Sequence, residues 1–192
     1  PASKSVEDIL GYHYYTELAH SAGMSKNQLD PALSPRERVR AIIRYMDRYS
    51  NTAQYQWFLE IAHVFLGFQG KQITSKDADW LFDESEKRMA QPDWEEQVLK
   101  RSNLLQVFLT NEFDDPLTGF DTNRYIPCLR TDDLVFRLDQ PAVKERLARA
   151  TNQDGGGVPS LRKAITHLFE HFTKNNARAC AISLPPSFSP RR

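Results

Sequence analysis

Apolar residues in the first half of the chain recur every three or four positions, which is the spacing of one face of an α-helix. The first run includes Val6, Leu10, Tyr14 and Leu18, and Gly23 ends it. The same spacing predicts further helices within 34–46, 53–66, 74–89 and 92–99.

The second of these runs begins with a helix-start signal. Ser34 is followed by Pro35, and Glu37 lies three residues after Ser34. A Ser that bonds to the backbone three residues ahead, while a Glu there bonds back, forms a capping box, and Pro is favoured at the first helical position. The sequence therefore predicts a helix that starts at Pro35.

The second half has short, nearly continuous apolar runs in place of the helical spacing. Such runs are typical of strands buried on both faces of a parallel sheet, although Pro127 disfavours a central strand. Helical stretches at about 140–151 and 158–175 lie between the second run and the third. This order predicts an α/β unit. The three predicted strands are 104–110 (LLQVFLT), 125–130 (YIPCLR) and 179–184 (ACAISL).

Composition and charge exclude several classes of protein. The chain has 25 Lys+Arg and 25 Asp+Glu, so its net charge favours neither nucleic acid nor an anionic membrane as a partner. No run in the sequence approaches the about 18 apolar residues of a membrane span. Cys128 and Cys180 lie in apolar runs, so we expect both to be buried free thiols in a reducing compartment. We expect a globular, cytoplasmic protein.

Arg130 ends the second predicted strand, ahead of a flexible loop. A guanidinium held on a rigid element can bind a carboxylate or phosphate through two parallel hydrogen bonds. The alternative is a structural ion pair with Asp132 or Asp133.

An aromatic cluster at 12–15 (YHYY) places His13 beside Tyr14. A stripe of aromatic side chains on a helix is usually a packing feature. A His beside a Tyr can also help to ionise the phenol, which would suit acid–base chemistry.

Several other motifs favour structural roles. His167 and His171 match the H-x-x-E-H spacing of a zinc site, but both lie toward the polar side of the predicted helix, so we interpret them as a solvated face. The charged run at 144–146 (KER) is interpreted in the same way. Asp114 and Asp115 are either paired acids or a turn.

A set of short motifs, taken in order, resembles the uronate isomerases of the amidohydrolase superfamily. The resemblance covers nearly the whole chain, and it depends on the order of the motifs more than on any single one. The matching segments are 11–14 (GYHY) with 22–23 (AG), 108–115 (FLTNEFDD), 128–132 (CLRTD) and 181–188 (AISLPPSF).

The resemblance implies a distorted (β/α)₈ barrel with a long helical insertion after its first strand. Residues 1–103 would form the insertion, and 104–192 would form part of the barrel, with three parallel strands. The family's metal-binding His-x-His does not occur in this sequence, and a barrel of about 250 residues cannot close with this chain. We therefore expect a central fragment of a longer enzyme, in which a divalent metal such as zinc has its ligands outside these residues.

The activity implied by the resemblance is the interconversion of aldouronates and ketouronates, such as glucuronate and fructuronate, in carbohydrate catabolism. Carried over by motif, Tyr14 would be the catalytic acid and base, and His13 its hydrogen-bonding partner. Arg130 would bind the carboxylate of the uronate substrate. No metal ligand is assigned within this chain, and we expect the fragment alone to be inactive.

Two alternatives remain open. The first is a metal-dependent hydrolase or decarboxylase of the same superfamily that acts on another carboxylate. The second is a non-catalytic helical interaction domain with a small appended sheet, which would expose an apolar patch on its helices. The sequence leaves open the uronate epimer and whether the protein forms a homo-oligomer.

Overall fold

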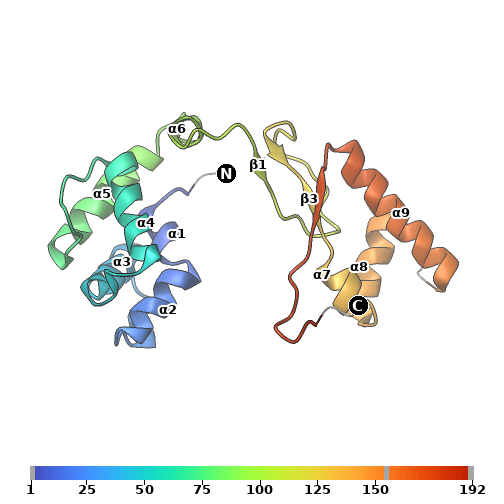
Figure 1. Cartoon of the computed structure of the whole chain (residues 1–192), viewed down its shortest axis with the longest axis horizontal. Coiled ribbons are helices and arrows are strands. Elements are labelled where there is room, and N and C mark those ends of the chain that lie inside the picture. Colours follow the sequence, from blue (N-terminus) through green and yellow to red (C-terminus); the bar gives the residue numbers. More distant parts are fainter. Residues whose placement is uncertain (1–2, 154–155, 190–192) are drawn as a thin grey trace. The chain divides into compact units, whose positions relative to one another are not determined.

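The computed structural model describes residues 3–153 and 156–189. The chain divides into two compact units, Pro1–Asn103 and Leu104–Arg192, which we call the N-terminal and the C-terminal unit. Figure 1 shows the first as a cluster of helices and the second as helices beside short strands.

The regular elements described within 3–103 are all helices, as the apolar spacing predicted. The π-helix η3 continues α4 without a break, and Gly67 ends it in the left-handed conformation, with φ of 76°. The α-helices are α1 (Val6–Leu10), α2 (His13–Ser21), α3 (Pro35–Ile43), α4 (Ala53–Ile61), α5 (Ala78–Met89) and α6 (Trp94–Arg101). The shorter elements are the 3₁₀ helices η1 (Lys26–Leu29), η2 (Met46–Tyr49) and η4 (Ser75–Asp77) and the π-helix η3 (Ala62–Leu66).

The first predicted helix is two helices in the structure, α1 and α2, which separate at Gly11. The Gly11 N–H donates to the Glu7 carbonyl at 2.7 Å, and a Cβ at this position would lie 2.8 Å from that oxygen. Glycine therefore permits the tight end of α1. Because the chain turns here, Tyr14 leaves the predicted apolar face and is 49% exposed, whereas Tyr15 is buried.

A continuous apolar core holds the N-terminal unit together, with buried side chains from α1 to α6. Phe58 is fully buried, and its ring meets that of Tyr15 edge to face, with centroids 6.1 Å apart. The buried Ser85 hydroxyl accepts from the Val6 N–H at 3.2 Å and donates to the Phe82 carbonyl at 2.8 Å. It thereby pairs a donor at the start of α1 that the helix itself leaves free.

The capping box predicted at the start of α3 is confirmed. The Ser34 hydroxyl accepts from the Glu37 N–H at 3.3 Å, and the Glu37 carboxylate accepts from the Ser34 N–H at 2.8 Å. The hydrogen bonds from Ser34 hold the pKa of Glu37 below its usual range.

The C-terminal unit has parallel strands with helices between them, which confirms an α/β unit. Strand β1 pairs in parallel with β2, and β3 pairs in parallel with β4. A parallel bridge between Asn111 and Leu129 carries the chain after β1 along β3. The elements are β1 (Val107–Phe108), β2 (Tyr125–Ile126), β3 (Cys128–Arg130), α7 (Asp132–Phe136), α8 (Pro141–Thr151), α9 (Val158–Lys174) and β4 (Ala179–Ala181).

The strands are shorter than the predicted runs, and Pro127 divides the second run into β2 and β3. The carbonyls of Ile126 and Cys128 accept from the N–H groups of Leu109 and Asn111, at 2.9 Å each. Because backbone groups alternate along a strand, position 127 turns toward the opposite side. There the pairing with β4 begins one residue later, at Cys128. The missing N–H of Pro127 is therefore tolerated.

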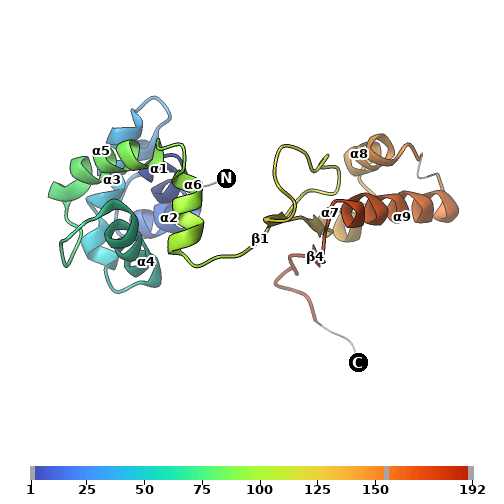
Figure 2. The same cartoon turned by 90° about the horizontal axis from the view of Figure 1, so that it is seen from above.

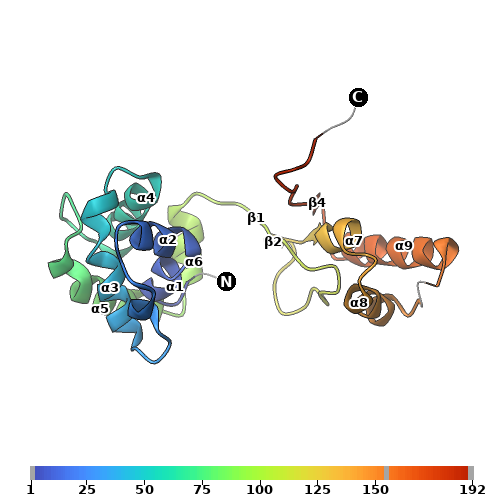
Figure 3. The ribbon, with the colours of Figure 1, turned by 90° about the horizontal axis from the view of Figure 1, so that it is seen from below.

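Helices α8 and α9 pack against each other and lie on the same side of the strands (Figures 2 and 3). Their apolar faces meet Leu129 of β3 and the segment that follows β1. The buried core residues of this unit are Phe113, Leu117, Leu129, Val143, Leu147, Ala164, Leu168 and Phe172.

The expectation of two buried cysteines is half wrong. Cys128 is buried, and burial raises the pKa of its thiol, but Cys180 is exposed. Cys180 lies on β4 and lines an open hollow of about 310 Å³ with Phe169 and Thr173. An apolar run predicts a strand, but its side chains are buried only where another element covers them.

Candidate functional site

Arg130 is the last residue of β3, and the backbone around it is held from both sides. Its N–H donates to the Asn111 carbonyl at 2.9 Å, and the N–H of Thr131 donates to the Ala181 carbonyl at 2.8 Å. The Arg130 side chain is 40% exposed. A rigid strand end thus presents a half-exposed cation.

Two carboxylates lie near this guanidinium at distances too long for good charge-assisted hydrogen bonds, which are typically about 2.7–2.9 Å. Nη1 of Arg130 is 3.5 Å from Oε1 of Glu112, and Nε is 3.4 Å from Oδ2 of Asp132. Burial favours a higher pKa for Asp132, but hydrogen bonds from Ser183 and Arg130 outweigh burial and lower it. Of the two predicted structural partners, Asp132 pairs loosely with Arg130, whereas Asp133 pairs with Arg146 at 2.8 Å.

Arg130 faces a hollow of about 370 Å³ that is lined by charged side chains of both signs. A lining of this kind suits a small, charged molecule that is rich in hydroxyl groups better than an apolar one. The lining residues are Glu112, Arg130, Asp132, Asp133, Arg137 and Arg146.

Arg146, on α8, organises one side of this hollow. Its guanidinium binds the Asp114 carboxylate through two hydrogen bonds, Nε to Oδ2 at 2.9 Å and Nη2 to Oδ1 at 2.5 Å, and Nη1 donates to Asp133 at 2.8 Å. Nη2 also lies 3.4 Å from Glu112, and the guanidinium sits 4.6 Å above the centre of the Phe113 ring. The Arg146 contact holds the pKa of the Asp114 carboxyl below its usual range, and these carboxylates raise the pKa of Arg146.

The interpretation of 144–146 as a solvated face is wrong for Arg146. This residue lies three positions after Val143 and one before Leu147, both buried, so it borders the apolar stripe of its helix. Its position beside the apolar stripe was the feature of the sequence that could have indicated a partly buried arginine. The choice between paired acids and a turn is also resolved, because the Asp115 carboxylate accepts from the Leu117 N–H at 2.7 Å, which is a turn contact, while Asp114 pairs with Arg146.

His13 and Tyr14 lie at the start of α2, in the N-terminal unit. The His13 ring lies between two tyrosines, with its centroid 4.4 Å from Tyr12 and 4.1 Å from Tyr14. Tyr12 and Tyr14 meet edge to face at 5.2 Å. The structure therefore brings together the predicted acid–base pair as one exposed cluster. Arg130, the third predicted residue, belongs to the C-terminal unit.

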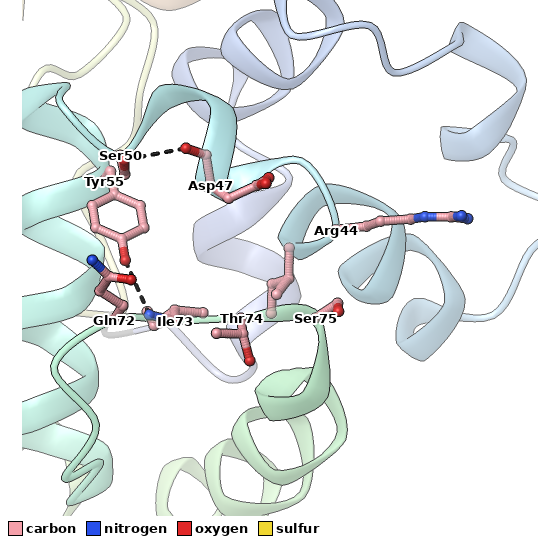
Figure 4. Close-up of a pocket in the computed structure, with 9 residues that line it drawn as sticks. Arg44, Asp47, Ser50, Tyr55, Gln72, Ile73, Thr74 and Ser75 are labelled. Atoms are coloured by element: carbon pink, nitrogen blue, oxygen red, sulfur yellow. Dashed lines mark hydrogen bonds between the residues drawn. The ribbon is translucent and has the colours of Figure 1, made fainter.

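A second hollow, of about 260 Å³, lies within the N-terminal unit (Figure 4). The Ile73 N–H donates to the Tyr55 hydroxyl at 3.0 Å, and the Ser50 hydroxyl donates to the Asp47 carbonyl at 3.1 Å. The first contact ties the loop before α5 to α4, and the second closes the turn at the end of η2. We therefore assign these two hydroxyl groups a structural role. The hollow is lined by Ile43, Arg44, Asp47, Ser50, Tyr55, Gln72, Ile73, Thr74 and Ser75.

Comparisons with known proteins identify the relatives of this chain. No protein-family model matches it. A uronate isomerase of Corynebacterium efficiens is 28% identical over 161 residues, which are 76% of this chain and 34% of the relative. A uronate isomerase of Corynebacterium glutamicum is 34% identical over 132 residues, 65% of this chain and 24% of the relative. A third uronate isomerase, of Mannheimia succiniciproducens, is 22% identical over 186 residues, which are 89% of this chain and 39% of the relative. Over these stretches the chain is similar in sequence to uronate isomerases.

Solved structures of uronate isomerases share the fold of this chain. Glucuronate isomerase of Caulobacter crescentus matches with a TM-score of 0.81 at 20% identity, over 95% of this chain and 42% of that one. Uronate isomerase of Thermotoga maritima matches with a TM-score of 0.79 at 17% identity, again over 95% and 42%. The chain thus spans between about a quarter and two fifths of the length of the relatives described here.

The donor groups that the structure describes do not form a site for the divalent metal implied by the resemblance to uronate isomerases. Among residues 3–153 and 156–189, no group of three or more His, Cys, Asp or Glu side chains could hold a metal ion. His167 is exposed, as its polar-side position predicted. The interpretation as a solvated face is wrong for His171, which is half-buried and bonds to the Asp115 carbonyl through Nε2, at 3.2 Å.

None of the helices in the described part of the chain combines the length and apolar character needed to cross a membrane.

Proposed function

We propose that this chain forms part of a uronate isomerase and supplies two components of its active site. Arg130 binds the carboxylate of the sugar acid, and Tyr14, supported by His13, moves the proton between C2 and C1. The observation that carries the proposal is the loosely paired Arg130 guanidinium at the charged hollow, within a chain related to uronate isomerases.

Arg130 can still form two short hydrogen bonds with a carboxylate, and a uronate has one. Its contacts with Glu112 and Asp132 are longer than the hydrogen bonds of a guanidinium with a well-placed carboxylate. A substrate carboxylate can replace both long contacts with two parallel, shorter ones. The charged groups around the hollow can then bind the sugar hydroxyls.

The proton transfer needs a single group that first accepts and then donates. For an aldouronate, the ionised Tyr14 takes the proton from C2, the C–H electron pair forms the C1–C2 double bond, and the C1 carbonyl electron pair moves to the C1 oxygen. The C2 hydroxyl passes its proton to the C1 oxygen. Its remaining electron pair forms the C2 ketone, while the C1–C2 double-bond pair takes the proton from Tyr14 at C1 and leaves Tyr14 ionised again. The His13 ring, in contact with Tyr14, assists by hydrogen bonding when the phenol changes charge.

We further propose that residues 104–192 are part of a (β/α)₈ barrel and that residues 1–103 are a helical insertion into it. The parallel pairing of β1 with β2 and of β3 with β4 supports the barrel. In parallel barrels the active site lies at the carboxyl ends of the strands, which is where Arg130 and Glu112 stand. The proposed substrate is a small-molecule uronate, and the proposed location of the enzyme is the cytoplasm.

Replacement of Arg130 tests the carboxylate site. In the protein that carries this chain, Arg130→Ala should raise KM for glucuronate or galacturonate about tenfold to a hundredfold, because two charge-assisted hydrogen bonds are lost. Arg162→Gln, which changes an exposed cation on α9, should leave KM unchanged. An Arg130→Ala protein that unfolds would show that the residue is a structural ion partner instead.

Replacement of Tyr14 tests the proton transfer. Tyr14→Phe should lower kcat by about a hundredfold to ten-thousandfold with little change in KM. Tyr12→Phe is the matched control, because Tyr12 is an exposed tyrosine of the same cluster. Equal losses in both variants would assign the cluster to packing and not to catalysis.

A further inference from the structure

The segments that follow β1 and β3 place several carboxylates near Arg130 and Arg146. Glu112 and Asp114 follow β1, whereas Asp132 and Asp133 follow β3. Glu112 and Asp132 lie 3.5 Å and 3.4 Å from the Arg130 guanidinium and can compete with a substrate carboxylate for it. The affinity of Arg130 for a substrate therefore depends on what else binds these carboxylates.

Arg146 binds two of them closely. It holds Asp114 through two hydrogen bonds and Asp133 through one, with distances from 2.5 to 2.9 Å. The Arg146 side chain is 29% exposed and covers the Phe113 ring. A partly buried, planar guanidinium with three short contacts has little freedom to turn away.

Glu112 is shared between the two arginines. Its Oε2 lies 3.4 Å from Nη2 of Arg146, and its Oε1 lies 3.5 Å from Nη1 of Arg130. If Arg146 were removed, Arg130 would be the one arginine of the two left beside Glu112. The contact between Glu112 and Arg130 would then become shorter.

We propose that Arg146 is a positioning residue for the carboxylate site: by binding Asp114 and Asp133 and drawing Glu112 toward itself, it leaves the Arg130 guanidinium available to a uronate carboxylate. The inference rests on the proposed function of Arg130. Arg146 acts in it through Glu112 and does not itself bind the substrate carboxylate.

The kinetic test is a double-mutant cycle in the protein that carries this chain. Arg146→Gln should raise KM for the uronate about tenfold, with kcat changed less than about threefold, because binding is lost and not the proton transfer. Adding Glu112→Gln should return KM to within about threefold of the Glu112→Gln protein, because the competing carboxylate is gone. Lys144→Gln, at an exposed position of the same helix, should leave KM unchanged. A rise in KM that Glu112→Gln does not relieve would overturn the proposal.

A chemical test does not depend on turnover. Phenylglyoxal modifies free guanidinium groups, and mass spectrometry of the peptide that contains Arg130 measures the rate of its modification. This rate should fall severalfold in Arg146→Gln, recover in the double variant, and rise in Glu112→Gln alone. Equal rates in all four proteins would reject the role of Arg146.

The two tests separate this inference from the proposed function. If the wild-type protein converts no uronate, the proposed function fails, and the modification rates still decide whether Arg146 controls the availability of Arg130. If Arg146→Gln does not fold, Arg146→Lys keeps the charge but loses the two-pronged contact with Asp114. A KM increase smaller than tenfold, relieved by Glu112→Gln, is then expected, and an unchanged KM and modification rate would reject the proposal.

Discussion

An exposed ion pair of the N-terminal unit, Arg40–Asp79, contrasts with the Arg146–Asp114 pair of the C-terminal unit, which lies beside the strand ends and against the apolar core. Arg40 pairs with Asp79 at 2.7 Å, and both side chains are about half exposed. Arg146 pairs with Asp114 above the buried Phe113 ring. Exposed ion pairs add little to stability. When one member of a partly buried pair is removed, the other charge is left partly buried without its partner, which is destabilising. Arg38 and Glu7 form a comparably buried pair in the N-terminal unit, at 2.7 Å, but Arg146 joins three carboxylates in one cluster. The C-terminal unit therefore holds several charges in fixed positions at one place, as a binding site requires.

The largest expected effects come from the two apolar cores. Phe58→Ala in the N-terminal unit and Phe172→Ala in the C-terminal unit should each lower the free energy of unfolding by about 3–5 kcal/mol, because both rings are fully buried. Hydrogen exchange resolved by residue should locate each loss in the unit that carries the substitution. Trp57→Ala and Phe169→Ala are exposed controls. A loss spread equally over both units would break the comparison.

The next effect concerns the charges of the C-terminal unit. Asp114→Asn should lower the free energy of unfolding at pH 7 by about 1–3 kcal/mol, because Arg146 loses a partly buried partner. Asp139→Asn, at an exposed carboxylate, is the control and should change little. Chemical denaturation followed in this unit measures both.

The same pair gives the C-terminal unit a dependence on acid. The pKa of Asp114 is lower in the folded protein than its unfolded value of about 3.9. Its stabilisation is therefore complete above that value and is lost as the pH falls through the folded pKa. Wild type should lose more stability between pH 5 and pH 2 than Asp114→Asn does, as measured by denaturation at each pH. Parallel curves for the two proteins would contradict the contact.

Smaller losses of stability are expected when two buried hydroxyl groups are removed, that of Ser85 in the N-terminal unit and that of Thr151 in the C-terminal unit. Ser85→Ala should cost about 1–2 kcal/mol, because it leaves the Val6 N–H buried without its acceptor. Thr151→Val should cost less than about 1 kcal/mol, because Thr151 donates only to the Leu147 carbonyl in its own helix, at 2.7 Å. Thermal unfolding of both variants measures the difference, and a larger loss for Thr151→Val would reverse this part of the comparison.

A further small effect is expected at the start of α3. Ser34→Ala should destabilise the N-terminal unit by about 1 kcal/mol, because it removes the capping hydroxyl. Ser34→Thr keeps the hydroxyl and should retain most of the stability. Equal losses in the two variants would show that the hydroxyl is not what stabilises this end of the helix.

The sequence predicted the helices of the first half well because their apolar spacing depends on local geometry alone. The break at Gly11 was missed because Val6, Leu10 and Tyr14 keep the helical spacing across it. The sequence indicated only that Pro127 disfavours a central strand, and it did not predict the division into β2 and β3. The cost of the missing N–H depends on which side of the strand it faces, which the sequence does not show.

The candidate site was predicted less completely. His13, Tyr14 and Arg130 come from the resemblance to a family, and their roles remain proposals. The contacts of Arg146 could not be predicted, because Asp114 lies 32 residues away in the chain, and only the folded strands and α8 bring the two together. Tertiary ion pairs of this kind leave no periodic pattern in a sequence.

The segment that joins the two units has a practical consequence. Leu104 and Leu105 are both exposed and lie outside any helix or strand, and Asn103 before them has φ of 54°. A protease that cleaves after leucine would find an accessible peptide bond there. Brief digestion therefore offers a way to recover each half as a separate piece and to ask which of them retains its own fold.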